Sequence, residues 1–471
     1  MTRTLPSVEP PDPCPRRTSR DVRRDLYAAG TAAALVTAAV LVGRHIQNTR
    51  HTLSVGWPPV LGSWQPHVGP GTPSAVLVAV LTVVHGPALA SRLPWRTLLP
   101  LAWGTFMAWI FSLALVDGPR RGISGRLTTR NEYLRVVDRF HDIPAALDGF
   151  TQHILIQSPD NWPAHVAGHP PAATLTFVLL DRLGLRGGGW AGVWCITVGA
   201  SACVAVLVAV RVLADERAAR RAAPFLVVAP AAVWMGTSAD AYFAAVAAWA
   251  VALLAVTLTR GSLRAAAASG LLFGLVCYLS YGLTLFVLVA AAVLFLGRQR
   301  MRARPVLLVP LLAGASVVPI AFTLAGFDWW EAYHLLVVRY YQGVGGTRPY
   351  GYWVWANLAC AVLITGPATA AGLRRAGTAL LRRPGDPANR PDGPRDPSPA
   401  TARLALLTAA AVTTLLVADL SGMSKAETER IWLPFALWLL PACALLTRPR
   451  AWLAVQAALA LLLNHLLMTG W

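Results

Sequence analysis

The sequence predicts an all-α, polytopic helical membrane protein. Hydrophobic residues fill 55% of the 471 positions and charged residues only 13%, whereas soluble domains carry about 25% charged residues. Many apolar runs approach the ~20 residues that a helix needs to cross a hydrocarbon core. These two observations exclude a soluble globule with an ordinary surface.

The apolar runs predict about 12–14 transmembrane or half-spanning helices in a single transmembrane domain over residues 26–471. Residues 1–25, which are rich in Pro and Arg, are expected to form a disordered cytoplasmic tail. The candidate segments are 26–43, 74–91, 97–116, 165–183, 190–212, 223–236, 240–259, 263–280, 282–297, 305–325, 353–372, 404–420, 431–447 and 451–468.

Basic residues set the expected orientation. The net charge of +19 would suggest nucleic acid in a soluble protein, but here the arginines stand in short segments between apolar runs, such as 298–304 and the loop 373–403. The positive-inside rule places these segments and the N-terminus in the cytoplasm of a multi-pass protein of the cytoplasmic (plasma) membrane. Membrane lipid, and not nucleic acid, is therefore the expected partner. Loops 117–169, 326–352 and 421–430 then face outward.

If all fourteen segments crossed the membrane fully, the loops could not all lie on the sides that their charges indicate. The number of crossings is wrong by one. One segment is therefore expected to enter and leave on the same side or to cross only half of the membrane. The segment 165–183 is the first candidate because it contains Pro170-Pro171, and broken helices at membrane depth are tolerated where they line a cavity.

The outer loop 117–169 is the most polar stretch between the apolar runs, and it contains the predicted catalytic carboxylates, Glu132 and Asp138. A carboxylate beside a low-dielectric surface can accept a proton from an incoming hydroxyl. Glu132 is the preferred base; Asp117 and Asp142 are rivals, and a solvated loop acid would show the same pattern. The neighbours Arg130 and Asn131 are predicted to bind substrate.

His165 and His169 lie one helical turn apart just before Pro170-Pro171. Two histidines at this spacing can bind a divalent cation, but the sequence fixes no third ligand. A helix that begins at prolines also leaves N–H groups free for a phosphate, so both histidines are predicted substrate ligands. A structural helix start would look the same. The six cysteines show no CxxC spacing and support neither a disulfide framework nor a zinc site.

Four further cations in the outer loops are predicted to bind phosphate: Arg339, Arg348, Lys425 and Arg430. The first two lie among many aromatic residues, which is also typical of an interfacial anchor. The last could simply pair with Glu427, three residues earlier. Asp240 begins an apolar run and is interpreted as a helix N-cap.

Several of these segments together resemble the C-type (GT-C) membrane glycosyltransferases, which include protein mannosyltransferases and actinobacterial wall arabinosyl- and mannosyltransferases. The resemblance rests on Asn131-Glu132-Tyr133, His169-Pro170-Pro171, Pro230-Ala231-Ala232-Val233-Trp234 leading to Asp240, the break at Ser280-Tyr281-Gly282, and the segment 427–435. The chain departs from that family in two ways. Asn131 replaces the first residue of an acidic pair, and two spans precede the acidic loop where better-known members have one.

The resemblance implies transfer of a hexosyl or pentosyl group from a polyprenyl-phosphate donor to a glycan, lipid or protein acceptor, with inversion. Glu132 would be the base, and His169, Arg339 and Arg348 would bind the phosphate; a divalent cation is possible. The alternatives are a transporter or flippase of lipid-linked sugars, for which matched sequence halves are expected and not found, and a non-catalytic cell-envelope protein.

Overall fold

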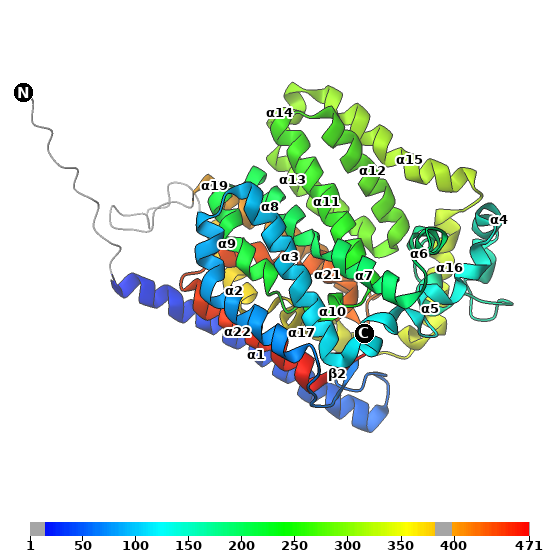
Figure 1. Cartoon of the computed structure of the whole chain (residues 1–471), viewed down its shortest axis with the longest axis horizontal. Helices are drawn as coiled ribbons and strands as arrows, with labels where there is room; N and C mark the ends of the chain where they lie inside the picture. The colour runs from blue at the N-terminus through cyan, green and yellow to red at the C-terminus, as the bar shows by residue number, and fades with distance from the viewer. Residues whose placement is uncertain (1–14, 382–397, 471) are drawn as a thin grey trace, which may run out of the picture.

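The computed structural model describes residues 15–381 and 398–470, which form a bundle of helices with one two-stranded sheet (Figure 1). Among these residues seven helical segments are long and apolar enough to cross a membrane. The prediction of an all-α polytopic protein is therefore confirmed. The seven segments contain α1 (Pro15–Arg50), α2 (Thr72–Arg92), α3 (Trp95–Ala114), α7 (Gly187–Ala200) with α8 (Ala202–Leu213), α11 (Ala239–Arg260), α15 (Leu308–Leu324) and α19 (Pro399–Leu420).

The other predicted segments are shorter or broken. The helices α17 (Tyr350–Thr365) and α18 (Pro367–Leu381) meet at an angle of 106° and make at most one further span. The remaining apolar helices are α12 (Leu263–Leu279), η6 (Tyr281–Leu285) with α13 (Phe286–Leu296), α21 (Leu433–Ala436) with η9 (Leu440–Leu445), and α22 (Pro449–Leu466).

Two predicted segments form helices that are too short to cross a membrane singly. The stretch 165–183 folds as α5 (Ala164–Ala167) and α6 (Ala172–Arg182). With 11 residues, α6 is about 16 Å long, roughly half of a ~30 Å hydrocarbon core, as expected for the half-spanning segment. The stretch 223–236 falls on the end of α9 (Glu216–Val227) and on α10 (Ala232–Met235).

The predicted N-terminal tail is helical over the part that the structure describes, because α1 begins at Pro15; residues 1–14 lie outside the described residues. Asp25 of α1 is fully buried, and its two carboxylate oxygens lie 2.7 Å from Arg374 and 2.6 Å from Arg375 of α18. The expected loop 373–403 is accordingly helical up to Leu381 and again from Pro399, with 382–397 outside the described residues.

The core is centred on α11, which is 83% buried over its span. It packs against α7, α8, α12, α13 and α21, and small residues allow close approach: a Cβ added to Gly199 would lie 2.9 Å from the Cβ of Ala241. In Figure 1 the helices α12 to α15 lie to one side of α11, with α14 (Arg298–Ala303) and η7 (Pro305–Leu307) joining them, while α1 and α22 lie on the opposite side.

The three loops predicted to face outward are built from short helices. Loop 117–169 contains η1 (Leu115–Asp117), η2 (Arg120–Ser124), η3 (Arg126–Thr128), η4 (Tyr133–Phe140), α4 (Ile143–Asp148) and η5 (Phe150–His153) before α5. Loop 326–352 contains α16 (Trp329–Gln342) and η8 (Val344–Gly346), and loop 421–430 ends in α20 (Thr428–Ile431). The sheet pairs β1 (Gly62–Trp64) antiparallel to β2 (Leu467–Thr469).

Candidate functional site

A cavity of about 830 Å³ lies where the three loops meet. Its wall is built by α5, the first turn of α11, η6, α16, η8, the end of α19 and α20. Seven of the ten residues predicted as catalytic or substrate-binding line it: Asn131, His165, His169, Arg339, Arg348, Lys425 and Arg430. Segments about 300 residues apart in the chain are thus brought to one place.

Glu132 lies directly behind this wall. Its side chain is buried, with 6% of the residue exposed, and its Oε1 lies 2.9 Å from Nδ1 of His165. The loop is held against α5 because the backbone N–H of His165 donates to the carbonyl of Asn131 at 3.0 Å. His165 lines the cavity, so Glu132 reaches the cavity through the imidazole.

Arg430 continues the chain of charges. It is 4% exposed and forms an ion pair with Asp240, while a second guanidinium nitrogen lies 3.4 Å from Nε2 of His165 and 3.7 Å from Glu427. Four ionisable side chains, Glu132, His165, Arg430 and Asp240, therefore form a continuous row. Burial in low dielectric strengthens each contact in such a row.

The Asp240 interpretation from sequence needs correction. The N-cap of α11 is Ser238, whose hydroxyl oxygen accepts a hydrogen bond from the N–H of Asp240 at 3.1 Å. Asp240 stands in the first turn, with its carboxylate at the cavity wall and directed to Arg430. The sequence therefore located the helix start but missed the partner, which is 190 positions away.

Two further cations are buried at the wall. Arg348 donates to the carbonyls of Leu53 at 3.1 Å and Lys425 at 2.7 Å, and lies 3.5 Å from Glu427. The Lys425 ammonium donates to the carbonyl of Gly345 at 3.0 Å. These neutral carbonyls position the cations but do not cancel their charge.

Arg339 has a different setting. It donates to the carbonyls of Ile154 at 2.6 Å and Trp162 at 2.9 Å and so joins α16 to loop 117–169. Although it lines the cavity, most of its hydrogen-bonding capacity holds the two outer loops together.

His169 faces the cavity as a neutral group. Burial lowers its pKa to about 4, and its Nδ1 lies 2.7 Å from the carbonyl of His165. A protonated His169 as a phosphate partner is therefore not supported, although its Nε2 can still exchange a hydrogen bond with a ligand.

The two histidines do not fit a divalent cation. Both ring nitrogens of His165 are engaged, with Glu132 on one side and the Arg430 guanidinium on the other, and a guanidinium repels a metal ion. Within residues 15–381 and 398–470, no three His, Cys, Asp or Glu side chains gather as a metal site.

Two predicted site residues, Arg130 and Asp138, and one alternative base, Asp142, lie away from the cavity. Arg130, before η4, and Asp138, within η4, are exposed and do not line it. The Asp142 carboxylate caps α4 by accepting from the N–H of Ala145 at 3.2 Å. Glu132, by contrast, contacts a residue that lines the cavity, His165.

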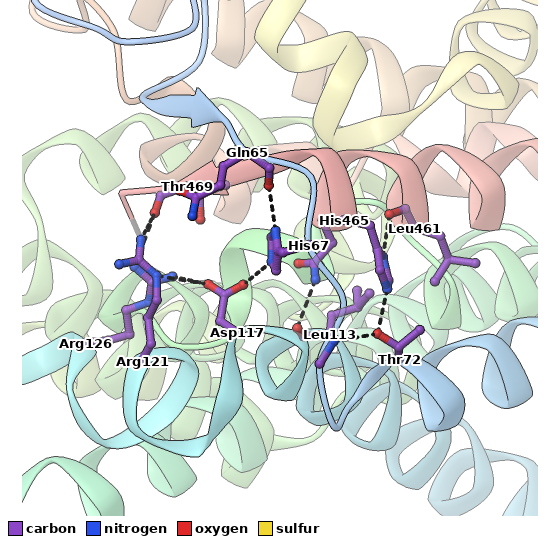
Figure 2. A network of polar contacts seen from close by, with 12 residues as sticks. Gln65, His67, Thr72, Leu113, Asp117, Arg121, Arg126, Leu461, His465 and Thr469 are labelled. Atoms are coloured by element: carbon purple, nitrogen blue, oxygen red, sulfur yellow. Dashed lines mark hydrogen bonds and ion pairs between the residues drawn. The ribbon is translucent and has the colours of Figure 1, made fainter.

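Asp117, the remaining rival, is a structural anchor (Figure 2). Its carboxylate lies 2.9 Å from His67 and 2.9 Å from Arg126, and Arg121 is 3.5 Å away. Arg121 and Arg126 also donate to the carbonyl of Thr469 in β2, at 3.0 and 3.4 Å. Asp117 therefore ties the start of loop 117–169 to the C-terminal strand and is not free to act as a base.

Other cavity residues were not identified from sequence. Glu427, Ser280, Tyr281, Trp329 and Tyr333 line the wall. From the sequence, the break at Ser280-Tyr281-Gly282 is one of the motifs of the family resemblance, Glu427 is a possible partner of Arg430, and the aromatic residues are typical of an anchor; none of them is predicted to bind substrate. Glu429, next to Arg430, is fully buried; its carboxylate accepts from the N–H of Leu61 at 2.8 Å.

Comparison with known proteins gives limited information. No family model matches the sequence, and no curated protein matches it either. Three solved structures of the Archaeoglobus fulgidus oligosaccharyltransferase are similar over most of this chain. The form tethered to an acceptor peptide is 12% identical, with a TM-score of 0.39, over 79% of this chain and 49% of that one.

The other two forms are similarly distant. The apo form is 12% identical, with a TM-score of 0.35, over 79% of this chain and 50% of that one. The complex with zinc and sulfate is 15% identical, with a TM-score of 0.35, over 82% and 53%. The chain spans about half the length of these structures, and similarities at this level do not assign it to a family.

Proposed function

We propose that this protein is a membrane glycosyltransferase that moves a sugar from a polyprenyl-phosphate donor to an acceptor at the outer face of the cytoplasmic membrane, with inversion. The observation that carries the proposal is the row Glu132–His165–Arg430–Asp240 at the wall of a large cavity with excess positive charge. An acid–imidazole pair and adjacent buried cations are the two elements that this chemistry requires.

The charge of the cavity suits a phosphate. Four cations line the wall, against the two carboxylates of Asp240 and Glu427. Arg348, Lys425 and Arg430 are each at most 9% exposed, so an anion placed among them would be poorly screened by water. Such a wall stabilises the negative charge that develops on a departing phosphate.

The same cavity has an apolar side that suits a polyprenyl chain. Leu283 and Leu285 of η6, Leu336 of α16 and Val417 of α19 line it, and Val417 is 41% exposed. A lipid-linked donor needs an apolar lining of this kind beside a cationic pocket.

The reaction steps follow from these positions. The acceptor hydroxyl displaces the 3.4 Å contact between Arg430 and Nε2 of His165. That nitrogen takes the proton of the hydroxyl, while Nδ1–H of the imidazole donates to Glu132. The hydroxyl oxygen attacks the anomeric carbon while the bond from that carbon to the phosphate oxygen breaks. The electron pair leaves with the polyprenyl phosphate, whose charge is stabilised by Arg430, Arg348 and Lys425. The Glu132–His165 pair thus takes the role that the sequence assigned to Glu132 alone.

The test uses the full chain in liposomes with radiolabelled polyprenyl-phosphate sugars, hexosyl and pentosyl, and a membrane glycan extract as acceptor. We expect release of polyprenyl phosphate coupled to labelled product. Arg348→Gln should slow this release strongly, and the matched exposed variant Arg130→Gln should not. Movement of intact donor across the bilayer without release would instead identify a flippase and overturn the proposal.

A further inference from the structure

A second cavity lies away from the proposed active site, among α2, α9, η9 and α22. Its volume is about 400 Å³. It belongs to the end of the molecule where α9 begins, beside the last turn of α2: Arg220 donates to the carbonyls of Ala90 and Leu93 at 2.7 and 2.8 Å. The positive-inside rule places this end at the cytoplasmic surface.

The mouth of this cavity carries excess positive charge. Arg217, Arg220 and Arg221 line it with one acid, Glu216. Glu216 is already paired with Arg220 and Arg211, each at 2.6 Å. Arg217 and Arg221 stand one helical turn apart on the same face of α9, and neither forms an ion pair with any described residue.

Like charges crowd around Arg221. Arg375 lies beside it, since Arg221 and Arg375 donate to the adjacent carbonyls of Leu446 and Leu445. Burial, Arg217 and Arg375 together lower the pKa of Arg221. Asp25 is shared between Arg375 and Arg374, and Glu216 between Arg220 and Arg211, so the Arg217–Arg221 pair has no counter-ion among the described residues.

The inner wall of the cavity is apolar. Pro87 of α2, Pro224 and Phe225 of α9, Leu446 and Pro449 line it. An arginine mouth above an apolar wall between helices complements one class of ligand, a phosphate attached to hydrocarbon chains. A soluble phosphate would use the mouth but gain nothing from the wall.

We propose that this cavity binds an anionic phospholipid of the cytoplasmic leaflet, with its phosphate between Arg217 and Arg221 and an acyl chain along Pro87 and Phe225. The proposal is independent of the activity at the other cavity.

The test measures lipid binding by native mass spectrometry on the full chain in neutral detergent, titrated with phosphatidylglycerol or phosphatidylcholine. Phosphatidylglycerol should bind saturably and phosphatidylcholine weakly. Arg217→Gln/Arg221→Gln should weaken phosphatidylglycerol binding by roughly ten- to thirty-fold, because each removed arginine contributes to affinity about as much as one basic residue at an anionic membrane surface. The matched control, Arg298→Gln/Arg302→Gln on α14, removes the same charge outside the cavity and should leave binding unchanged.

A second variant tests the apolar wall without changing charge. Ser91 lines the cavity and is exposed, so Ser91→Trp should fill the space and reduce phosphatidylglycerol binding, with the melting temperature confirming that the protein still folds. Equal loss in the α14 control, no loss in the Arg217/Arg221 variant, or full displacement of lipid by inorganic phosphate at millimolar concentration would each overturn the proposal.

Discussion

The sharpest test of the proposed site is the substitution Glu132→Gln. It keeps the shape of the side chain and removes its charge 2.9 Å from Nδ1 of His165. The glutamine amide cannot stabilise a protonated imidazole as the buried carboxylate does, because only the carboxylate carries the opposing charge. His165 should therefore become a much weaker proton acceptor.

The expected magnitude follows from this role. General-base assistance contributes about 10²- to 10⁴-fold to a rate, which corresponds to about 3–5 kcal/mol of transition-state stabilisation. We expect kcat to fall within that range. KM for the donor should change little, because neither Arg348 nor Lys425, the proposed phosphate ligands, contacts Glu132.

The assay is the initial rate of polyprenyl phosphate release in liposomes, compared with Asp138→Asn. This control makes the same acid-to-amide change in the same loop at an exposed position, and it should keep the parent rate. The double variant Glu132→Gln/His165→Gln should be no slower than His165→Gln alone, because residues that act as one unit are not additive.

Three results would refute this reasoning. Glu132→Gln could retain a rate within a factor of two of the parent, Asp138→Asn could lose as much, or the two losses could add fully in the double variant. The last result would mean that Glu132 acts independently of His165.

Three further substitutions test the buried charges. Asp240→Asn leaves the Arg430 guanidinium without its closest carboxylate, and we expect a loss of about 3–5 kcal/mol, seen as a lower melting temperature in detergent; an unchanged melting temperature would contradict a buried pair. Burial raises the pKa of the Glu429 carboxyl from 4.5 to about 7. The folded state then holds this proton more tightly than the unfolded chain, so stability is full below about pH 4.5 and falls by roughly 3 kcal/mol as the pH rises to about 7. Glu429→Gln should flatten the melting temperature over this range, and an unchanged pH slope would count against the burial. Asp117→Asn weakens the contact with Arg126 (Figure 2), and hydrogen exchange should show faster exchange in 467–469; unaltered protection there would exclude the anchoring role.

The class of fold could be predicted from sequence because its signal is local. A helix that crosses lipid must satisfy its own backbone and present apolar side chains to its surroundings, so α2, α11 and α15 stand out as apolar runs. Helix ends could be predicted less well. The first helix extends back to Pro15 across five arginines, because Asp25 is buried against Arg374 and Arg375, and that contact depends on a helix about 350 residues later.

Some residues of the candidate site could also be predicted from the sequence, because their signal is local too. Polar residues such as His165 and Arg430 are conspicuous in an apolar chain, since buried charge is costly without a partner. The pairing itself cannot be inferred from spacing. Asp240 carries the local pattern of a helix start, and only the packing of α20 against the bundle brings Arg430 to it. Asp138 is predicted from the same kind of signal, an acid in a polar loop, but on η4 its side chain is exposed.

The distribution of charge also bears on the choice between sugar transfer and sugar transport. A transporter requires polar groups that continue from one surface to the other. Here α11 occupies the centre of the bundle, and its buried residues from Ala241 to Ala255 are apolar throughout apart from the Tyr242 hydroxyl near the cavity. The ionisable groups gather at the two ends, around Arg430 at one and around Asp25 at the other. A path for a sugar phosphate through this centre would require α11 to move away from the helices packed around it, whereas transfer within the existing cavity requires no such opening. The arrangement therefore favours a donor that enters sideways from the lipid and leaves on the same face.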